Sequence, residues 1–490
     1  MSIGISEKSP FSKKCAKKKK TAAQHTKGYV SSRSFSSTRQ FEENDDFSGV
    51  PTIFAPITAI GKAGVAVIRI SGSKALQAVK FLGVNKNLKP RISNLCSITD
   101  PESKEIIDNA LITFFKAPNS FTGEDVIELN LHASSYIIRR VTELLLKLED
   151  VRLAEAGEFS KTAFLNGKMD LVQAEAIVDL IESETKEQHK QALRQMHGDL
   201  SNIYENWRER LINITANIEA YIDFPDEDLP EDIINDLESR VKELIEEINN
   251  HLHDNKRGEK IRNGLSLAII GAPNVGKSSL INYLAKSEVA IISDIAGTTR
   301  DIVETHLEIA GIAVVIADTA GLRETEDLIE KEGVKRALKK ADLADLKILV
   351  LDVNDLKDFN KNIDISLNDS LVVINKVDLK EVTIPDNIKK YNPILISIKN
   401  KINLEELLRI LEEKVKNLTL PGNSALITRQ RYRYALKEAL DNLSVFSLQK
   451  NIELAAEDLR LAVRAIGKIT GKVEVDDILD VIFSGFCIGK

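Results

Sequence analysis

Residues 266–281 read Ser266-Leu-Ala-Ile-Ile-Gly271-Ala-Pro-Asn-Val-Gly276-Lys277-Ser278-Ser-Leu-Ile281. An apolar run precedes a G-x-x-x-x-G-K-S sequence, and a helical pattern follows it. Glycines at 271 and 276 let backbone N–H groups turn toward phosphate oxygens, and the N-terminus of the following helix adds partial positive charge. Lys277 is placed to reach the outer phosphates, and the Ser278 hydroxyl is placed to bind Mg²⁺. This stretch predicts a phosphate-binding loop between a strand and a helix.

Three further polar motifs follow apolar runs that are typical of strands. They are Asp318-Thr319-Ala320-Gly321, Asn375-Lys376-Val377-Asp378 and Ser397-Ile398-Lys399. Because the carboxyl ends of parallel strands line the ligand crevice of an α/β sheet, these motifs should meet there. Asp318 suits the Mg²⁺ shell, Gly321 the γ-phosphate, and the carboxylate of Asp378 the paired N–H donors of guanine.

Four motifs in this order resemble the G domain of Ras-like GTPases, which implies GTP binding. The implied nucleotide contacts are Asn274, Val275, Gly276, Lys277, Ser278, Ser279, Ser293, Asp294, Ile295, Ala296, Gly297, Thr298, Thr299, Asp318, Thr319, Ala320, Gly321, Asn375, Lys376, Val377, Asp378, Ser397, Ile398 and Lys399.

Length and composition set the class of protein. A chain of 490 residues predicts about three domains. Its 43% hydrophobic and 29% charged residues are typical of a soluble globular protein. Three widely spaced cysteines provide neither a disulfide framework nor a zinc site, which favours a reducing compartment. We expect no membrane association, and the net charge of −7 leaves only local patches for RNA contact.

The first 50 residues form a basic, serine-rich extension. Residues 1–40 carry ten Lys and Arg against the single acid Glu7, a balance that favours a mitochondrial transit peptide. A disordered basic tail and upstream codons misread as protein in a bacterial gene are the alternatives. The predicted location is the mitochondrial matrix if the extension is a transit peptide, and the bacterial cytoplasm is the alternative.

The remaining chain divides into three kinds of region. Strand patterns around a helical stretch at 135–148 predict an α+β domain over residues 51–167. Helical periodicity over 168–263 and again over 418–490 predicts an all-α bundle, with residues 256–264 as the linker into the G domain. The G domain, 264–417, is then inserted in this bundle. The predicted fold class is multidomain α/β.

Several segments make the resemblance more specific. Gly61-Lys-Ala-Gly-Val-Ala-Val-Ile-Arg-Ile-Ser-Gly72, Asn119-Ser-Phe-Thr-Gly-Glu-Asp125, Ala156-Gly-Glu-Phe-Ser160 and the terminal Phe486-Cys-Ile-Gly-Lys490 resemble the MnmE (TrmE) family of tRNA-modifying GTPases, which has a mitochondrial counterpart. The resemblance implies a homodimer whose N-terminal domain binds 5-formyltetrahydrofolate as one-carbon donor. Arg69, Glu128, Lys168 and Lys490 are the implied folate contacts. The sequence departs from the family's His-Gly-Gly at His132-Ala133-Ser134, where we expect a reshaped turn.

The family resemblance also implies a catalytic arrangement. Leu322 replaces the glutamine that orients water in many Ras-like proteins, and Glu330 matches the family's catalytic glutamate, although an exposed glutamate at a helix start is the alternative. K⁺ would bind the Asn274 side chain and oxygens of Ser293, Ile295 and Thr298. Mg²⁺ would bind Ser278 and Thr299. Cys487 matches a family cysteine with a role in modification, and its alternative is a buried apolar residue.

The predicted function is GTP hydrolysis coupled to tRNA modification. With an MnmG-type flavoprotein, in a heterotetramer whose FAD belongs to the partner, the resemblance implies formation of a carboxymethylaminomethyl or taurinomethyl group at carbon 5 of the wobble uridine. G-domain dimerisation in the presence of K⁺ would activate the GTPase. The alternative is a GTP-switched RNA- or ribosome-binding factor without modification chemistry.

Overall fold

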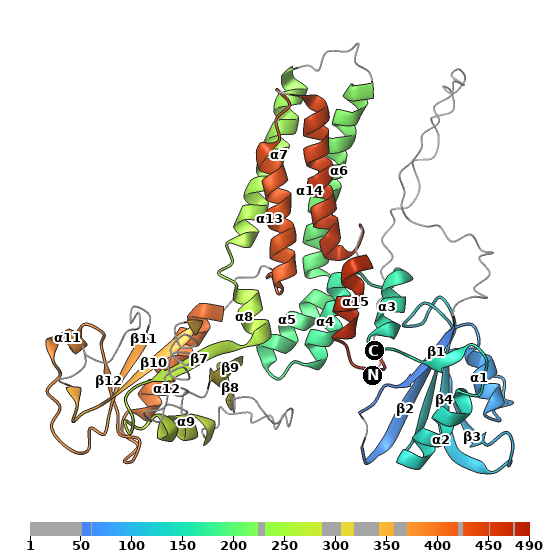
Figure 1. Ribbon diagram of the computed structural model, residues 1–490, viewed down its shortest axis with the longest axis horizontal. Helices are drawn as coiled ribbons and strands as arrows, with labels where there is room; N and C mark the ends of the chain where they lie inside the picture. Colours follow the sequence, from blue (N-terminus) through green and yellow to red (C-terminus); the bar gives the residue numbers. More distant parts are fainter. Residues whose placement is uncertain are drawn as a thin grey trace, which may run out of the picture. The chain divides into compact units, whose positions relative to one another are not determined.

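The computed structural model describes residues 51–59, 61–223, 231–286, 305–317, 343–356, 370–419, 425–449, 451–473 and 476–490. Two separate six-stranded sheets and a group of long helices make up these regions (Figure 1). The predicted multidomain α/β fold is confirmed. The N-terminal extension, residues 1–50, lies outside the described residues.

The first sheet is mainly antiparallel, with strand order β3-β4-β5-β2-β1-β6. Alternation of apolar and polar residues explains its two faces, since successive side chains of a strand point to opposite sides. Ile68, Ile112 and Leu129 are fully buried on one face, in a core that also holds residues of α1 and α2. Its elements are β1 (Thr52–Pro56), β2 (Ala63–Ser71), α1 (Ala75–Phe81), β3 (Ser93–Thr99), β4 (Ile106–Phe115), β5 (Val126–Ala133), α2 (Ser135–Leu145) and β6 (Val151–Leu153).

The helical region is held by a core in which Tyr204, Leu211, Leu244, Leu436 and Ile466 are buried. These residues come from α6, α7, α13 and α14, so segments on both sides of the G domain in sequence pack together. Its helices are α3 (Glu158–Leu165), α4 (Leu171–Ile181), α5 (Lys186–Met196), α6 (Asp199–Asp223), α7 (Glu231–Leu252), α8 (Arg257–Asn263), α13 (Gln430–Val445), α14 (Ile452–Thr470) and α15 (Asp476–Ser484).

The second sheet has the order β12-β11-β10-β7-β9-β8, and all strands except β8 run parallel. β7 lies between β9 and β10, so the strand order reverses at β7, where open α/β sheets bind ligands. The elements are β7 (Leu265–Ile270), α9 (Lys277–Lys286), β8 (Thr305–Ile309), β9 (Ile312–Ala317), β10 (Leu346–Asp352), β11 (Ser370–Asn375), α11 (Asp386–Lys389), β12 (Ile394–Leu395) and α12 (Leu404–Thr419).

The predicted linker at residues 256–264 is mostly helical, because residues 257–263 form α8. Long-range contacts stabilise this short helix. Ile261 is buried, and Arg433 donates a hydrogen bond to Glu259. A Cβ on Gly258 would lie 2.3 Å from the carbonyl oxygen of Ile427, so glycine permits the close approach. None of these contacts is visible as a local helix signal.

The departure at Ala133-Ser134 needs no glycine. Ala133 is paired with Ala63 in the sheet, and Ser134 has extended dihedrals (φ −90°, ψ 131°) as the N-cap of α2. Residues with side chains adopt these conformations without strain. The expected reshaping of the turn relative to the family's His-Gly-Gly stays a prediction.

Candidate functional site

The phosphate-binding loop joins β7 to α9 through three residues in the left-handed region. Gly271, Asn274 and Gly276 have φ values of 155°, 63° and 107°. A Cβ on Gly271 would lie 2.3 Å from the carbonyl oxygen of Val350, and one on Gly276 equally close to Nδ2 of Asn375. Both glycines are required by backbone conformation and by packing. The result is a cradle of the kind that binds phosphate.

Lys277 is the first residue of α9, and its ammonium group lies over the loop. Its Nζ donates hydrogen bonds to the carbonyl oxygens of Gly271 (2.9 Å) and Ala272 (2.8 Å). Burial lowers the pKa of Lys277 from its ordinary value. Ser278 and Ser279 follow in the exposed first turn of α9. Cationic, hydroxyl and helix N-terminal groups therefore lie together at the end of β7.

The Asn375-Lys376 pair ties the end of β11 to the phosphate-binding loop. Asn375 donates from Nδ2 to the carbonyl oxygen of Val275 at 2.8 Å and accepts at Oδ1 from the backbone N–H of Ile398 at 3.3 Å. Lys376 Nζ donates to the carbonyl oxygen of Asn274 at 2.7 Å. The phosphate-binding loop and the Asn-Lys-x-Asp motif, about 100 residues apart in sequence, thus lie side by side at one edge of the sheet.

Asp378 lies where the base would be recognised. Ser397 donates from Oγ to Asp378 Oδ1 at 2.5 Å and accepts a hydrogen bond from the backbone N–H of Asn400 at 3.1 Å. An ionised carboxylate can accept hydrogen bonds at both oxygens, which matches the paired N–H donors of a guanine edge. The serine fixes the orientation of this carboxylate.

A cavity of about 380 Å³ runs along this edge of the sheet. It is lined by Asn274, Gly276, Ser279, Asn375, Lys376, Asp378, Leu379, Ser397, Ile398 and Lys399. All of these except Leu379 are predicted nucleotide contacts, so the structure brings three of the four motifs together. The predicted contacts at 293–299 and 318–321, and the proposed catalytic Glu330, lie outside the described residues.

Asp352 belongs to this site but is absent from the sequence prediction. It ends β10, and its Oδ2 accepts a hydrogen bond from Lys376 Nζ at 2.7 Å. Burial alone would raise the pKa of Asp352, but hydrogen bonds from Lys376 and Asn354 lower it. The sequence signal for it is the apolar run Ile348–Leu351, which is followed directly by this acid. Leu379, the other missed residue, follows directly after the Asn-Lys-x-Asp motif.

A second candidate site lies on the N-terminal sheet. Arg69 of β2 and Glu128 of β5 are cross-strand partners, and Arg69 donates to Glu128 Oε1 from Nε (3.1 Å) and Nη2 (2.8 Å). Lys168, beyond α3, donates from Nζ to the carbonyl oxygen of Pro118 at 2.6 Å. Pro118 precedes Phe121, whose ring lies 4.9 Å from the guanidinium carbon of Arg69. One loop thus contacts both Arg69 and Lys168.

The C-terminal residues approach the same sheet. Ile488 forms an antiparallel bridge with Ala156, and a Cβ on Gly489 would lie 2.4 Å from the carbonyl oxygen of Pro56 in β1, the strand next to Arg69. The side chain of Cys487 is exposed, so the alternative of a buried apolar residue is wrong. The backbone N–H of Lys490 bonds to the carbonyl oxygen of Cys487 at 3.3 Å.

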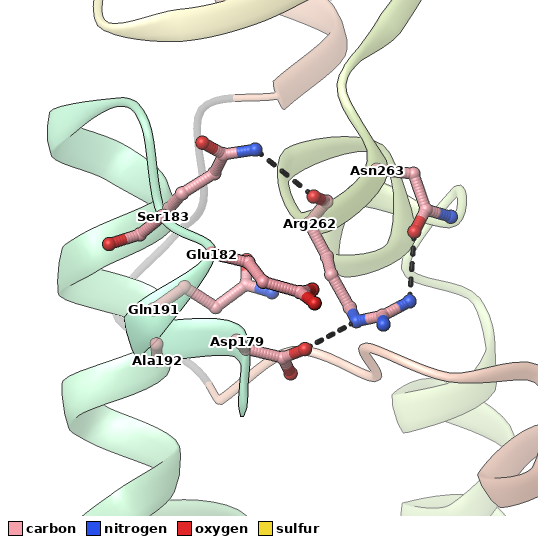
Figure 2. A pocket seen from close by; sticks show the side chains of 8 residues that line it. Asp179, Glu182, Ser183, Gln191, Ala192, Arg262 and Asn263 are labelled. Carbon is pink, nitrogen blue, oxygen red and sulfur yellow. Dashed lines mark hydrogen bonds and ion pairs between the residues drawn. The ribbon is translucent and has the colours of Figure 1, made fainter. Parts of the chain in front are cut away.

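A polar cavity of about 270 Å³ lies where α8 meets α4 and α5 (Figure 2). Arg262 of α8 reaches into it and donates from Nε to Asp179 of α4 at 2.7 Å. Gln188 of α5 donates to the carbonyl oxygen of Arg262 at 3.1 Å. Arg262 lies three residues before the start of β7, so this junction holds the chain at its entry into the second sheet.

The cavity at the carboxyl ends of the strands in the second sheet defines the class of protein. A phosphate-binding loop with an Asn-Lys-x-Asp motif at the carboxyl ends of parallel strands is the nucleotide site of a GTP-hydrolysing G domain. Within the described residues, no helix is long and apolar enough to cross a membrane.

Comparison with known proteins establishes the family. The family model of the MnmE helical domain matches residues 171–487, and that of the GTP-binding protein TrmE N-terminus matches residues 52–168. The tRNA modification GTPase MnmE of Rickettsia typhi is 50% identical over 446 residues, covering 90% of this chain and 100% of the relative. MnmE of Rickettsia bellii strain RML369-C is 49% identical over 448 residues, with the same coverage. The chain belongs to the MnmE family of tRNA modification GTPases.

Solved structures match a smaller part of the chain. Era of Aquifex aeolicus, bound to GDP·AlF₄⁻, is 26% identical and covers 37% of this chain and 68% of its own, with a TM-score of 0.24. The family assignment rests on the sequence relatives.

Proposed function

We propose that this chain is a GTP-hydrolysing enzyme that modifies the wobble uridine of certain tRNAs together with an MnmG-type flavoprotein. One observation supports the proposal above all. The cavity with the Asn-Lys-x-Asp motif occurs in the same chain as the two regions that match the MnmE helical and TrmE N-terminal family models. The MnmE relative of Rickettsia typhi matches this chain over its full length. A GTP-switched binding factor would need only the first of these features.

The proposed hydrolytic site combines residues of the cavity with residues 293–299 and Glu330, which lie outside the described part of the chain. Asp378 selects guanine, Asn375 fixes the loop, and Lys277 adds charge beside the phosphates. When bound, Mg²⁺ and K⁺ would offset charge that develops on the phosphate oxygens. Ser278 and Thr299 would hold Mg²⁺, and Asn274, Ser293, Ile295 and Thr298 would hold K⁺. Glu330 would orient the attacking water.

The proposed folate site uses the Arg69–Glu128 pair with Lys168 and Lys490. A guanidinium and an ammonium suit the carboxylates and carbonyls of a reduced folate, and Glu128 suits the N–H donors of its pterin. The tail that carries Cys487 and Lys490 packs against β1, which supports a site shared by the sheet and the C-terminus. We propose that the folate supplies the one-carbon unit and that Cys487 acts in the modification.

The proposed homodimer uses the open face of the N-terminal sheet. Leu95, Leu111, Asn130 and Val67 are successive cross-strand partners on β3, β4, β5 and β2. Leu95 and Leu111 are 67% and 48% exposed. Exposed apolar side chains that lie together on one surface usually mark an interface. A second copy of the chain is the partner that the family relationship supports.

The test reconstitutes the reaction with the full chain, a MnmG-type flavoprotein, tRNA, GTP, Mg²⁺, 5-formyltetrahydrofolate and either KCl or NaCl. Mass spectrometry of the tRNA nucleosides should find a modified wobble uridine only when both proteins are present. GTP turnover should be faster in KCl, and Glu330→Ala and Asn274→Ala should remove that difference. Glu332→Ala is the matched control. GTP turnover without any modified nucleoside would identify a GTP-switched RNA- or ribosome-binding factor instead.

A further inference from the structure

The guanidinium of Arg69 is enclosed by two aromatic rings and a carboxylate. Its carbon lies 4.9 Å from the ring centroid of Phe121 and 5.6 Å from that of Phe159, and Glu128 accepts hydrogen bonds from its Nε and Nη2. The Arg69 side chain is 16% exposed. A guanidinium is attracted electrostatically to the face of an aromatic ring, and this attraction is stronger where water is excluded.

The two rings come from outside the sheet. Phe159 belongs to α3 and is fully buried with Ile53, Ala55 and Ala154. Phe121 belongs to the loop between β4 and β5 and packs, partly buried, against the same cluster. Ala55 is the cross-strand partner of Arg69 on β1, so this cluster lies directly beside the arginine.

The loop that carries Phe121 is held in place by the next residue, Thr122. Thr122 is fully buried, its Oγ1 lies 2.7 Å from Ser71 Oγ, and its carbonyl oxygen accepts a hydrogen bond from Asn166 Nδ2 at 2.7 Å. Ser71 is two residues beyond Arg69 on β2 and so on the same face of the sheet. The position of the ring is therefore set by the protein.

We propose that Phe121 is a positioning residue that holds the Arg69 guanidinium in the orientation that binds the ligand of this domain. The proposal rests on the proposed function, in which Arg69 and Glu128 bind a reduced folate. Within the described part of the chain, the hydrogen bonds of this guanidinium use Nε and Nη2. The Phe121 ring lies against one face of the planar guanidinium, and the Glu128 carboxylate binds one of its edges. Together they restrict its rotation, so that the N–H groups of Nη1 are directed at a ligand oxygen.

The experiment measures affinity for 5-formyltetrahydrofolate by calorimetry on the full chain. Phe121→Leu removes the ring but keeps an apolar side chain, and Phe121→Tyr keeps the ring. We expect Phe121→Leu to weaken binding about tenfold and Phe121→Tyr to restore most of it. Phe115→Leu is the matched control. Phe115 is also half-buried, but its ring centroid lies 5.9 Å from the guanidinium carbon of Arg91. The Phe115→Leu variant should bind folate like the unmodified chain.

A double-mutant cycle decides whether Phe121 acts through Arg69. In the Arg69→Ala background, Phe121→Leu should cause no further loss. Unchanged affinity of Phe121→Leu, or an equal loss in both backgrounds, would overturn the positioning role while the folate site stands. No binding by the unmodified chain would overturn the folate site and this role together. GTP turnover of the Phe121 and Phe115 variants should match the unmodified chain, because the nucleotide edge is unchanged.

Discussion

Arg262 donates a hydrogen bond to Asp179 Oδ1 at 2.7 Å (Figure 2). The same carboxylate oxygen accepts one from Arg429 Nη2 at 2.8 Å. Arg262 lies just before β7, and Arg429 lies just before α13, so the two arginines flank the inserted domain in sequence. One carboxylate of α4 therefore holds both the entry into that domain and the exit from it. Its side chain is only 9% exposed.

Asp179→Ala should lower the free energy of unfolding by about 3 kcal/mol, because it leaves two half-buried arginines without their shared partner. Trp207, the single tryptophan of the chain, is buried in the helical core, so its fluorescence during urea unfolding reports on this region. Asp236→Ala removes an exposed ion pair with Arg240 and should change the value by less than about 0.5 kcal/mol. Equal unfolding curves for both variants would show that the junction contributes nothing to stability.

Gly276→Ala should abolish GTP binding without unfolding the protein. The new methyl group would lie 2.3 Å from Nδ2 of Asn375, and the backbone φ of 107° strains any residue with a side chain. Binding of a fluorescent GTP analogue provides the measurement. Gly61→Ala is the control, since no atom lies within 4 Å of the added Cβ. Retained affinity in Gly276→Ala would mean that the cradle tolerates a shift of Asn375.

Asp378→Asn should exchange guanine for xanthine recognition. The amide presents a donor where the carboxylate accepts, so one guanine N–H loses its partner and a xanthine carbonyl gains one. We expect GTP affinity to fall about 100-fold and XTP to compete better than GTP. Asp386→Asn, in an exposed pair with Lys389 on α11, should leave both affinities unchanged. A variant that still prefers GTP would place the base elsewhere.

Local sequence predicted the nucleotide edge well because its residue types are set by backbone geometry. Gly271 and Gly276 must be glycines where they stand, and a polar motif at the end of an apolar strand reaches the crevice in any parallel sheet. Asp352 escaped prediction because its role depends on pairing with Lys376 from another strand. The roles of Thr299, Asp318 and Glu330 stay predictions, since these residues lie outside the described part of the chain.

Long-range contacts explain the remaining misses. α8 exists because Ile427 and Arg433, from the far side of the inserted domain, pack against a segment whose own sequence reads as a linker. Phe121 likewise reads as one residue in a polar loop, and its contact with Arg69 follows only from anchoring by Ser71 and Asn166. A single sequence carries no record of such pairs.

Stability should fall between pH 6.5 and 4 because of one histidine. Burial lowers the pKa of His251 to about 4, and the nearby positive charge of Arg433 adds to that effect, while Asp254 opposes it. The ring lies against Tyr204 and Trp207 in the helical region. The unfolded chain takes up a proton below about pH 6.5 and the folded chain only below about pH 4, so acid favours unfolding in this window, by about 3 kcal/mol in all.

His251→Gln should remove this part of the pH dependence, because glutamine does not titrate and still bonds to the Tyr204 hydroxyl, which lies 3.3 Å from His251 Nε2. Urea unfolding followed by Trp207 fluorescence at pH 4.5, 5.5 and 6.5 gives the comparison. The free energy of the unmodified chain should fall more steeply with acid than that of His251→Gln. His253→Gln, at an exposed neighbouring histidine, should keep the slope of the unmodified chain. Parallel curves for all three proteins would mean that His251 is protonated as readily in the folded state as in the unfolded state.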